Sequence, residues 1–140
     1  MSKGFPSERE RRLWATQIYL VGAAGLVLPY LSRIPGELQG RPQWFAQYLS
    51  GGVAGALLLE LFNAIAVSVA VLLTARYHRR LLWALSVVPG YAFLWIAHSS
   101  VDLASDAQAS LALFFIPVFS LVIFGLCALL SEGIYRFSAR

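Results

Sequence analysis

The chain has 140 residues, of which 59% are hydrophobic and only 13% are charged, and its formal net charge is +4. Together with a mean hydropathy of +0.68, this composition excludes a soluble globular protein. We therefore expect residues 1–140 to form a single membrane domain.

Four apolar runs are long enough to cross a bilayer as helices, which takes about 17 to 25 residues. They cover residues 13–31, 49–74, 81–97 and 109–130. The runs are continuously apolar and lack the alternating polarity of barrel strands, so helices are the form that satisfies their backbones in lipid. The sequence thus predicts an all-α integral membrane protein, a bundle of four transmembrane helices. The spacing of Ser7 and Glu10 predicts a capping box at the start of the first helix.

Lysine and arginine residues fall mainly on one side of these runs. Nine of the eleven lie before the first run, between the second and third, or after the fourth, whereas Arg33 and Arg41 lie in the first loop of the other side. By the positive-inside rule, we expect both termini in the cytoplasm. Nucleic acid is not an expected partner, because the basic residues are spread over three short segments. The preference for arginine over lysine, with abundant Ala, Leu and Gly, points to a GC-rich bacterial genome and so to the bacterial cytoplasmic (inner) membrane.

Glu60 is the one ionisable residue within the second run. A carboxyl group at membrane depth costs roughly 2.5 kcal/mol or more, so it normally faces protein or water and marks a site of function. At 100° per residue it shares a helix face with the small residues Gly52, Ala56 and Ala64, and we expect this face to pack against another helix. Asn63, one turn inward, is its expected hydrogen-bond partner. The opposite face carries large residues expected to face lipid: Leu58, Phe62, Ile65, Val69 and Leu72.

Residue counts from the connection between the second and third runs place Tyr91 and His98 close to Glu60 in depth, one turn inward and one turn outward. A contact of Glu60 with either side chain is geometrically possible. Pro29 and Pro117 fall near the same layer, and a proline within a helix leaves a carbonyl about four residues earlier without its donor. Such carbonyls beside a carboxyl group would suit a cation or water pocket. The alternative is that neighbouring helices and waters compensate them.

The sequence contains no pattern typical of a metal, cofactor or catalytic site. Cys127 is the only cysteine, and His98 with Asp102 supplies only two candidate metal ligands. A nucleotide-binding loop, a zinc-protease helix motif and a nucleophile elbow are all missing. We therefore expect neither an enzyme nor a cofactor.

Three interpretations of Glu60 remain: a carboxyl group that only fixes helix packing, a proton- or cation-coupling site, and a contact to another subunit. The loops are too short for a ligand-binding domain, and four helices enclose little volume. The favoured prediction is therefore a small structural, regulatory or accessory subunit that acts through helix contacts in the lipid bilayer, in a homo-oligomer or a larger membrane complex. The alternative is a small proton- or cation-coupled transporter or pore, oligomeric and dependent on Glu60.

Overall fold

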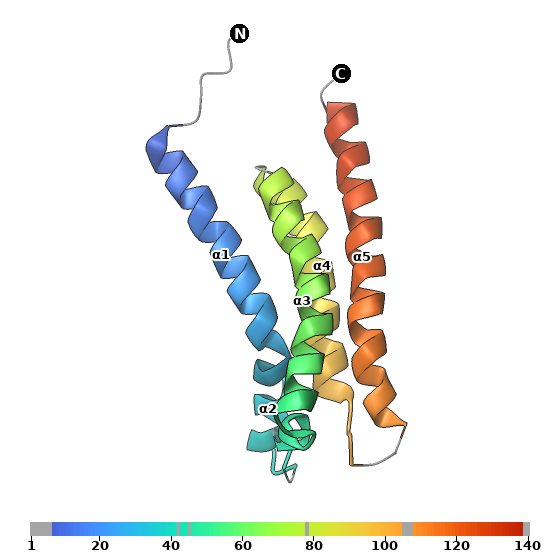
Figure 1. Cartoon of the computed structure of the whole chain (residues 1–140). Coiled ribbons are helices and arrows are strands. Elements are labelled where there is room, and N and C mark those ends of the chain that lie inside the picture. The colour runs from blue at the N-terminus through green and yellow to red at the C-terminus, as the bar shows by residue number, and fades with distance from the viewer. Residues whose placement is uncertain (1–6, 42, 45, 78, 105–107, 139–140) are drawn as a thin grey trace.

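The computed structural model of the chain describes residues 7–41, 43–44, 46–77, 79–104 and 108–138. All regular structure within these residues is helical. Four long helices run alongside one another in alternating directions (Figure 1): α1 (Glu8–Leu31), α3 (Gly52–Arg76), α4 (Arg80–Ser100) and α5 (Ala109–Ser138). Each of the four is long and apolar enough to cross a membrane, which confirms the predicted number of spans among the described residues.

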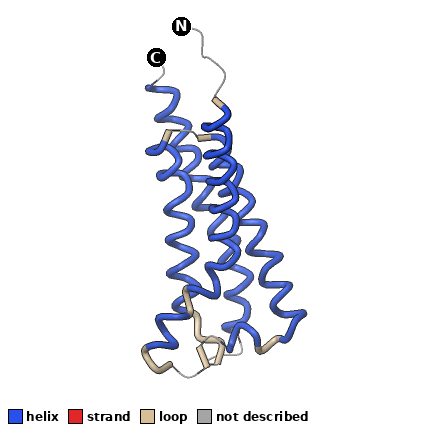
Figure 2. The backbone as a smooth tube through the Cα atoms, turned by 90° about the vertical axis from the view of Figure 1, so that its left-hand side faces the viewer, coloured by secondary structure: helices blue, strands red, loops and turns tan. Residues whose placement is uncertain are grey.

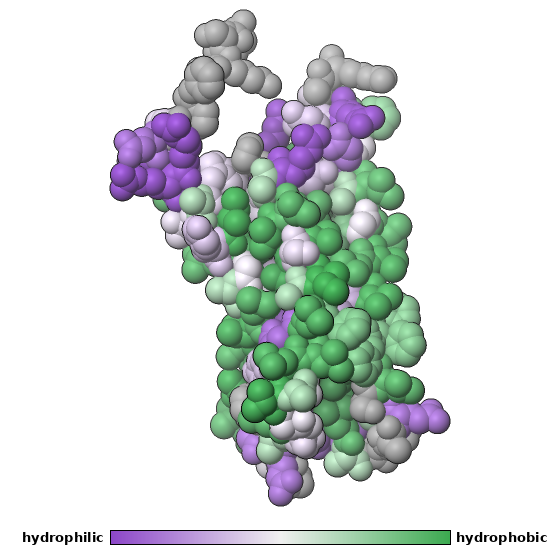
Figure 3. Space-filling model, in the orientation of Figure 1, coloured by the Kyte–Doolittle hydropathy of each residue, from purple (hydrophilic) through white to green (hydrophobic). Residues whose placement is uncertain are grey.

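The connections alternate between the two ends of the bundle. A short turn joins α3 to α4 at the end where α1 begins and α5 finishes, and the other two connections lie at the opposite end (Figures 1 and 2). The α1–α3 connection contains the short helix α2 (Ile34–Leu38) and the 3₁₀ turn η1 (Ala46–Leu49). Polar residues gather at both ends of the molecule, and an apolar band covers the helices between them (Figure 3). This banding is the surface expected of a chain that crosses a bilayer.

α1 begins at the predicted capping box. The Ser7 backbone N–H donates to Glu10 Oε2 at 2.7 Å, and the Glu10 N–H donates to Ser7 Oγ at 3.3 Å. These two bonds satisfy donors that the first turn of a helix leaves free.

The second span begins later than the apolar run suggests. α3 starts at Gly52 rather than at residue 49, because the η1 turn ends at Leu49 and Gly52 has a φ of 64°. Glycine adopts that left-handed conformation readily, so the chain changes direction there. At the other end of the sequence, α5 continues past the apolar run to Ser138, and its last turns carry an ion pair between Glu132 and Arg136 at 3.0 Å.

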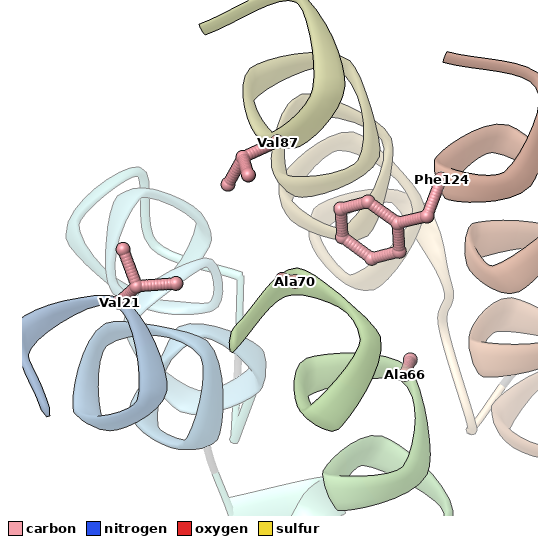
Figure 4. Packing of buried hydrophobic residues seen from close by; sticks show 5 residues of the cluster. All are labelled: Val21, Ala66, Ala70, Val87 and Phe124. Carbon is pink, nitrogen blue, oxygen red and sulfur yellow. The ribbon is translucent and has the colours of Figure 1, made fainter. Parts of the chain in front are cut away.

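The centre of the bundle is built from apolar side chains of four helices, four of them small or medium-sized and one a phenylalanine (Figure 4): Val21, Ala66, Ala70, Val87 and Phe124. Two glycines allow close approaches around this cluster. A Cβ atom at Gly90 would overlap the ring of Phe124, and one at Gly25 would lie 2.6 Å from both the hydroxyl of Tyr91 and a methyl group of Val67. The packing of α4 on α5 and of α1 on its neighbours therefore requires that these two positions carry no side chain.

Candidate functional site

Glu60 lies at the partly exposed edge of the bundle, between α3 and α1. It is about 12 Å along α3 from Gly52, where the helix begins. Side-chain hydrogen bonds join it to Tyr30 of α1 and to Asn63, one turn further along α3. The spacing in the sequence predicted the Asn63 contact. The contact with Tyr30 depends on the rotation of α1, which the sequence does not specify.

Asn63 is fully buried and connects the same two helices. Its Nδ2 donates to the backbone carbonyl of Gly25 in α1 at 3.0 Å. That carbonyl lies four residues before Pro29, which stands inside α1 and has no N–H to donate. The Asn63 amide thus supplies the hydrogen bond that Pro29 removes from α1. Its Oδ1 atom is buried and accepts no hydrogen bond from the described residues.

The buried side of α3 is rotated from its predicted position. Its six buried residues are Leu59, Asn63, Ala66, Val67, Ala70 and Thr74. At 100° per residue the centre of this set lies about 50° from the centre of the predicted small-residue face and about 70° from Glu60. The rotation follows from Ala66 and Ala70, whose small side chains let α3 pack against the central cluster on both sides. Glu60 is therefore at the edge of the buried side.

The predicted small-residue face is correspondingly incomplete. Ala56 and Ala64 are partly buried, but Gly52 is exposed, and a Cβ atom there would meet nothing within 4 Å. Gly52 sits at the very start of α3, where no other helix of the described chain reaches it. On the opposite face, Leu58 and Leu72 are exposed as predicted. The other large residues on that face differ in exposure, since Ile65 is exposed whereas Phe62 and Val69 are partly buried.

The two other candidate residues lie apart from the Glu60 carboxyl group. The Tyr91 hydroxyl donates to the Val21 carbonyl of α1 at 2.8 Å and packs beside Gly25. His98 is fully buried near the end of α4, where its Nδ1 lies 2.7 Å from the hydroxyl of Tyr48. Tyr91 and Asn63 thus both contact α1 around Gly25. His98 belongs to a second cluster near the end of α4.

That second cluster surrounds Arg33, whose position in the sequence indicates only a charged residue in the first loop. Arg33 is fully buried between α1 and α2. Its guanidinium group donates to the carbonyls of Trp44, His98 and Val101 and to Oε1 of Gln47, the last at 2.6 Å. These bonds fix the α1–α3 connection to the end of α4.

Aromatic rings and one acidic residue complete the Arg33 cluster. The guanidinium carbon lies 4.0 Å from the ring centre of Trp44 and 4.4 Å from that of Tyr48, within the range of cation–π attraction. Gln47 links the arginine to Asp102, because its Nε2 donates to Oδ1 of that residue at 2.9 Å. Burial raises the pKa of Tyr48 above its ordinary value, and the positive charge of Arg33 opposes part of that rise. The clue in the sequence was an arginine on the arginine-poor side, close to the aromatic residues at 44 and 48.

Both clusters join elements of the bundle through hydrogen bonds. Across the described ranges, no group of three or more His, Cys, Asp or Glu side chains is placed to hold a metal ion. Comparison of the chain with protein-family models, with curated proteins and with solved structures found no match.

Proposed function

We propose that this chain is a structural or regulatory subunit of a membrane complex, and that it binds a neighbouring transmembrane helix along the α3 edge that carries Glu60. The supporting observation is the position of Glu60 at the rim of the buried side. Two exposed leucines flank it, Leu57 at 65% and Leu61 at 60% exposure. A carboxyl group that opens toward lipid is costly, and a neighbouring helix that covers this edge removes that cost.

The contacts within the chain leave Glu60 without a cationic partner among the described residues. The two groups that hydrogen-bond to it, Tyr30 and Asn63, are both neutral. Arg33 is committed to three carbonyls and to Gln47. The neighbouring helix therefore has a definable chemistry, since it should bring a hydrogen-bond donor or a cation to the depth of Glu60.

The interior of the bundle favours this proposal over transport through a single chain. The central cluster is apolar and takes its side chains from α1, α3, α4 and α5. Around Gly25, the amide of Asn63 and the hydroxyl of Tyr91 already donate to backbone carbonyls. A proton or ion path would need a continuous row of water or free polar groups, and a single free acceptor such as the buried Asn63 Oδ1 does not form one.

We further propose that both termini face the cytoplasm of a bacterial cell whose inner membrane holds the protein. The support is the clustering of arginine at the end of the bundle where α1 begins and α5 finishes, with Arg9, Arg76 and Arg80 as examples. The test is a pair of reporter fusions after residue 140. If the proposal holds, a fused alkaline phosphatase is inactive and a fused fluorescent protein that matures only in the cytoplasm is fluorescent. The opposite pattern would overturn the orientation.

The subunit proposal is tested by photo-crosslinking in cells. A photoreactive amino acid at Leu57 or Leu61 should give a cross-link to one defined membrane protein, and the same group at Val122 on the exposed side of α5 serves as the control. Glu60→Leu should abolish the cross-link, whereas Glu60→Gln should keep it because the amide still forms hydrogen bonds. The captured chain should carry a polar residue in the span that contacts Leu57. Equal cross-linking from Val122, or cross-linking unchanged by Glu60→Leu, would contradict the proposal.

The transporter alternative gives a different result in liposomes. Purified protein would then carry a proton-linked flux, and Glu60→Gln would abolish it without a loss of folded protein. Such a result would overturn the subunit proposal. We expect the parent protein to show no flux above that of empty liposomes.

A further inference from the structure

An apolar groove of about 540 Å³ runs between α1 and α4. α1 diverges from α3 and α4 toward the end at which it begins (Figure 1). The groove is lined on one side by Leu20, Ala24 and Leu28 of α1 and on the other by Trp83, Val88 and Trp95 of α4, with Gln17 at one end. Because apolar side chains of two candidate membrane-spanning helices line the groove, its occupant enters from the membrane.

The length of the groove matches one leaflet of a bilayer. From Trp83 to Trp95 the rise along α4 is about 18 Å, and half of a hydrocarbon core about 30 Å thick is about 15 Å. The indole of Trp83 is held in place by a hydrogen bond from Nε1 to Thr74 Oγ1 at 3.0 Å. The groove therefore has a fixed wall at the end where α1 and α4 begin.

Two polar side chains at that end are available to a ligand. Arg80 is exposed and lies three residues before the groove-lining Trp83, on the same side of α4 but outside the groove itself. Gln17 of α1 lines the groove at that end. Within the described part of the chain, neither side chain forms a hydrogen bond or an ion pair. The other arginine beside it differs, since Arg79 donates to Ser138 and faces the ring of Tyr135. Arg80 thus places a positive charge about one turn beyond this end of the groove.

We propose that this groove binds an anionic phospholipid, with one acyl chain between α1 and α4 and its phosphate held by Arg80. Apolar walls of leaflet length suit an acyl chain, and a basic residue between helix ends suits an anionic head group. Gln17 donates to the ester or phosphate oxygens beside it. The inference is independent of any contact made by Glu60, which does not line the groove.

The test compares phosphatidylglycerol with phosphatidylcholine. Native mass spectrometry of the purified chain with an equimolar mixture should show about a fivefold preference for the anionic lipid, the factor that corresponds to one arginine near the head group. Arg80→Gln should remove the preference. Arg11→Gln, at an exposed arginine of α1 six residues before Gln17 and on another face of the helix, should leave it unchanged. An equal loss of the preference for phosphatidylglycerol in both arginine variants would show that the anionic lipid is attracted to the basic surface in general, and it would overturn the proposed site.

The proposed position of the acyl chain is tested by a second pair of variants, one in the groove and one beside it. Ala24→Leu fills the groove, whereas Ala23→Leu adds the same atoms at the neighbouring exposed position outside it. Only the first should release bound lipid. It should also reduce the quenching of tryptophan fluorescence by phosphatidylglycerol brominated on its acyl chains, because Trp83 and Trp95 both line the groove. Equal retention and equal quenching in both alanine variants would overturn the groove as the site of the acyl chain.

Discussion

The side-chain amide of Asn63 donates to the carbonyl of Gly25, the group that Pro29 leaves without a donor in α1. A proline in one helix and an amide in the next are therefore a matched pair. The hydrogen bond is 3.0 Å long and fully buried on the Asn63 side. It joins α1 to α3 where the backbone of α1 has lost one of its own bonds, and it places Asn63 beside Glu60.

This relationship predicts a specific double-mutant result. Asn63→Ala should lower the free energy of unfolding by about 1–3 kcal/mol, because it leaves a buried carbonyl without a donor. Pro29→Ala restores a backbone N–H at position 29, so Asn63→Ala should cost clearly less in that background. Denaturant unfolding of the four proteins in detergent measures the coupling. An equal cost of Asn63→Ala in both backgrounds would show that the Gly25 bond is not the cause.

The buried contacts of Arg33 predict a large loss of stability when this residue alone is replaced. Arg33→Gln should destabilise the protein by about 3 kcal/mol or more, because three carbonyls and Gln47 lose their donor in a buried place. Arg33→Lys should not restore stability, since an ammonium group cannot reproduce the planar set of donors. Faster amide hydrogen exchange in η1 should accompany the loss, because the arginine fixes this connection to α4.

Arg41 is the matched control for Arg33. It is exposed, and its guanidinium carbon lies 4.7 Å from the ring centre of the same Trp44. An exposed cation–π contact contributes about 0.5–1 kcal/mol, so Arg41→Gln should change the thermal midpoint only slightly. A similar loss of stability in Arg33→Gln and Arg41→Gln would mean that burial and hydrogen bonding do not determine how much each arginine contributes to stability.

Gly90 predicts a steric effect at the α4–α5 contact. Gly90→Ala should destabilise the chain by about 1–3 kcal/mol, because the added methyl group overlaps the fully buried ring of Phe124. Gly125→Ala is the control, since nothing lies within 4 Å of a Cβ atom at that position of α5. Thermal unfolding of both variants gives the comparison. A Gly90→Ala protein as stable as Gly125→Ala would show that the ring of Phe124 can move aside.

Local patterns in the sequence were sufficient for the main features of the fold. Hydropathy located the four apolar helices, because a spanning segment must be continuously apolar over a fixed length. The Ser7 and Glu10 spacing located the start of α1, because both capping bonds form within four residues. The pairing of Glu60 with Asn63 also lies within one helical turn.

Features that depend on the rotation of one helix against another were not predictable in this way. The Asn63 bond to Gly25 needs a specific rotation of α1, although Pro29 indicated that a carbonyl nearby lacked a donor. The Arg33 cluster needs the first connection to fold back onto the end of α4, which a charge count cannot show. Because Ala66 and Ala70 pack in the central cluster, the buried side of α3 is centred about 50° from the predicted face. Glu60 therefore lies at the edge of the buried side.

The edge position of Glu60 gives a last prediction, which separates stability from partner binding. Glu60→Leu should leave the unfolding midpoint of the isolated chain unchanged or raise it, because leucine removes a carboxyl group from a partly exposed place within an apolar span. Glu60→Gln should stay close to the parent, since it keeps hydrogen bonds to Tyr30 and Asn63. Asn63→Ala, one turn away but fully buried, should be clearly less stable than both. A loss of about 1 kcal/mol or more in Glu60→Leu would instead assign Glu60 to packing within the chain, because the carboxyl group would then contribute more through Tyr30 and Asn63 than it costs in lipid.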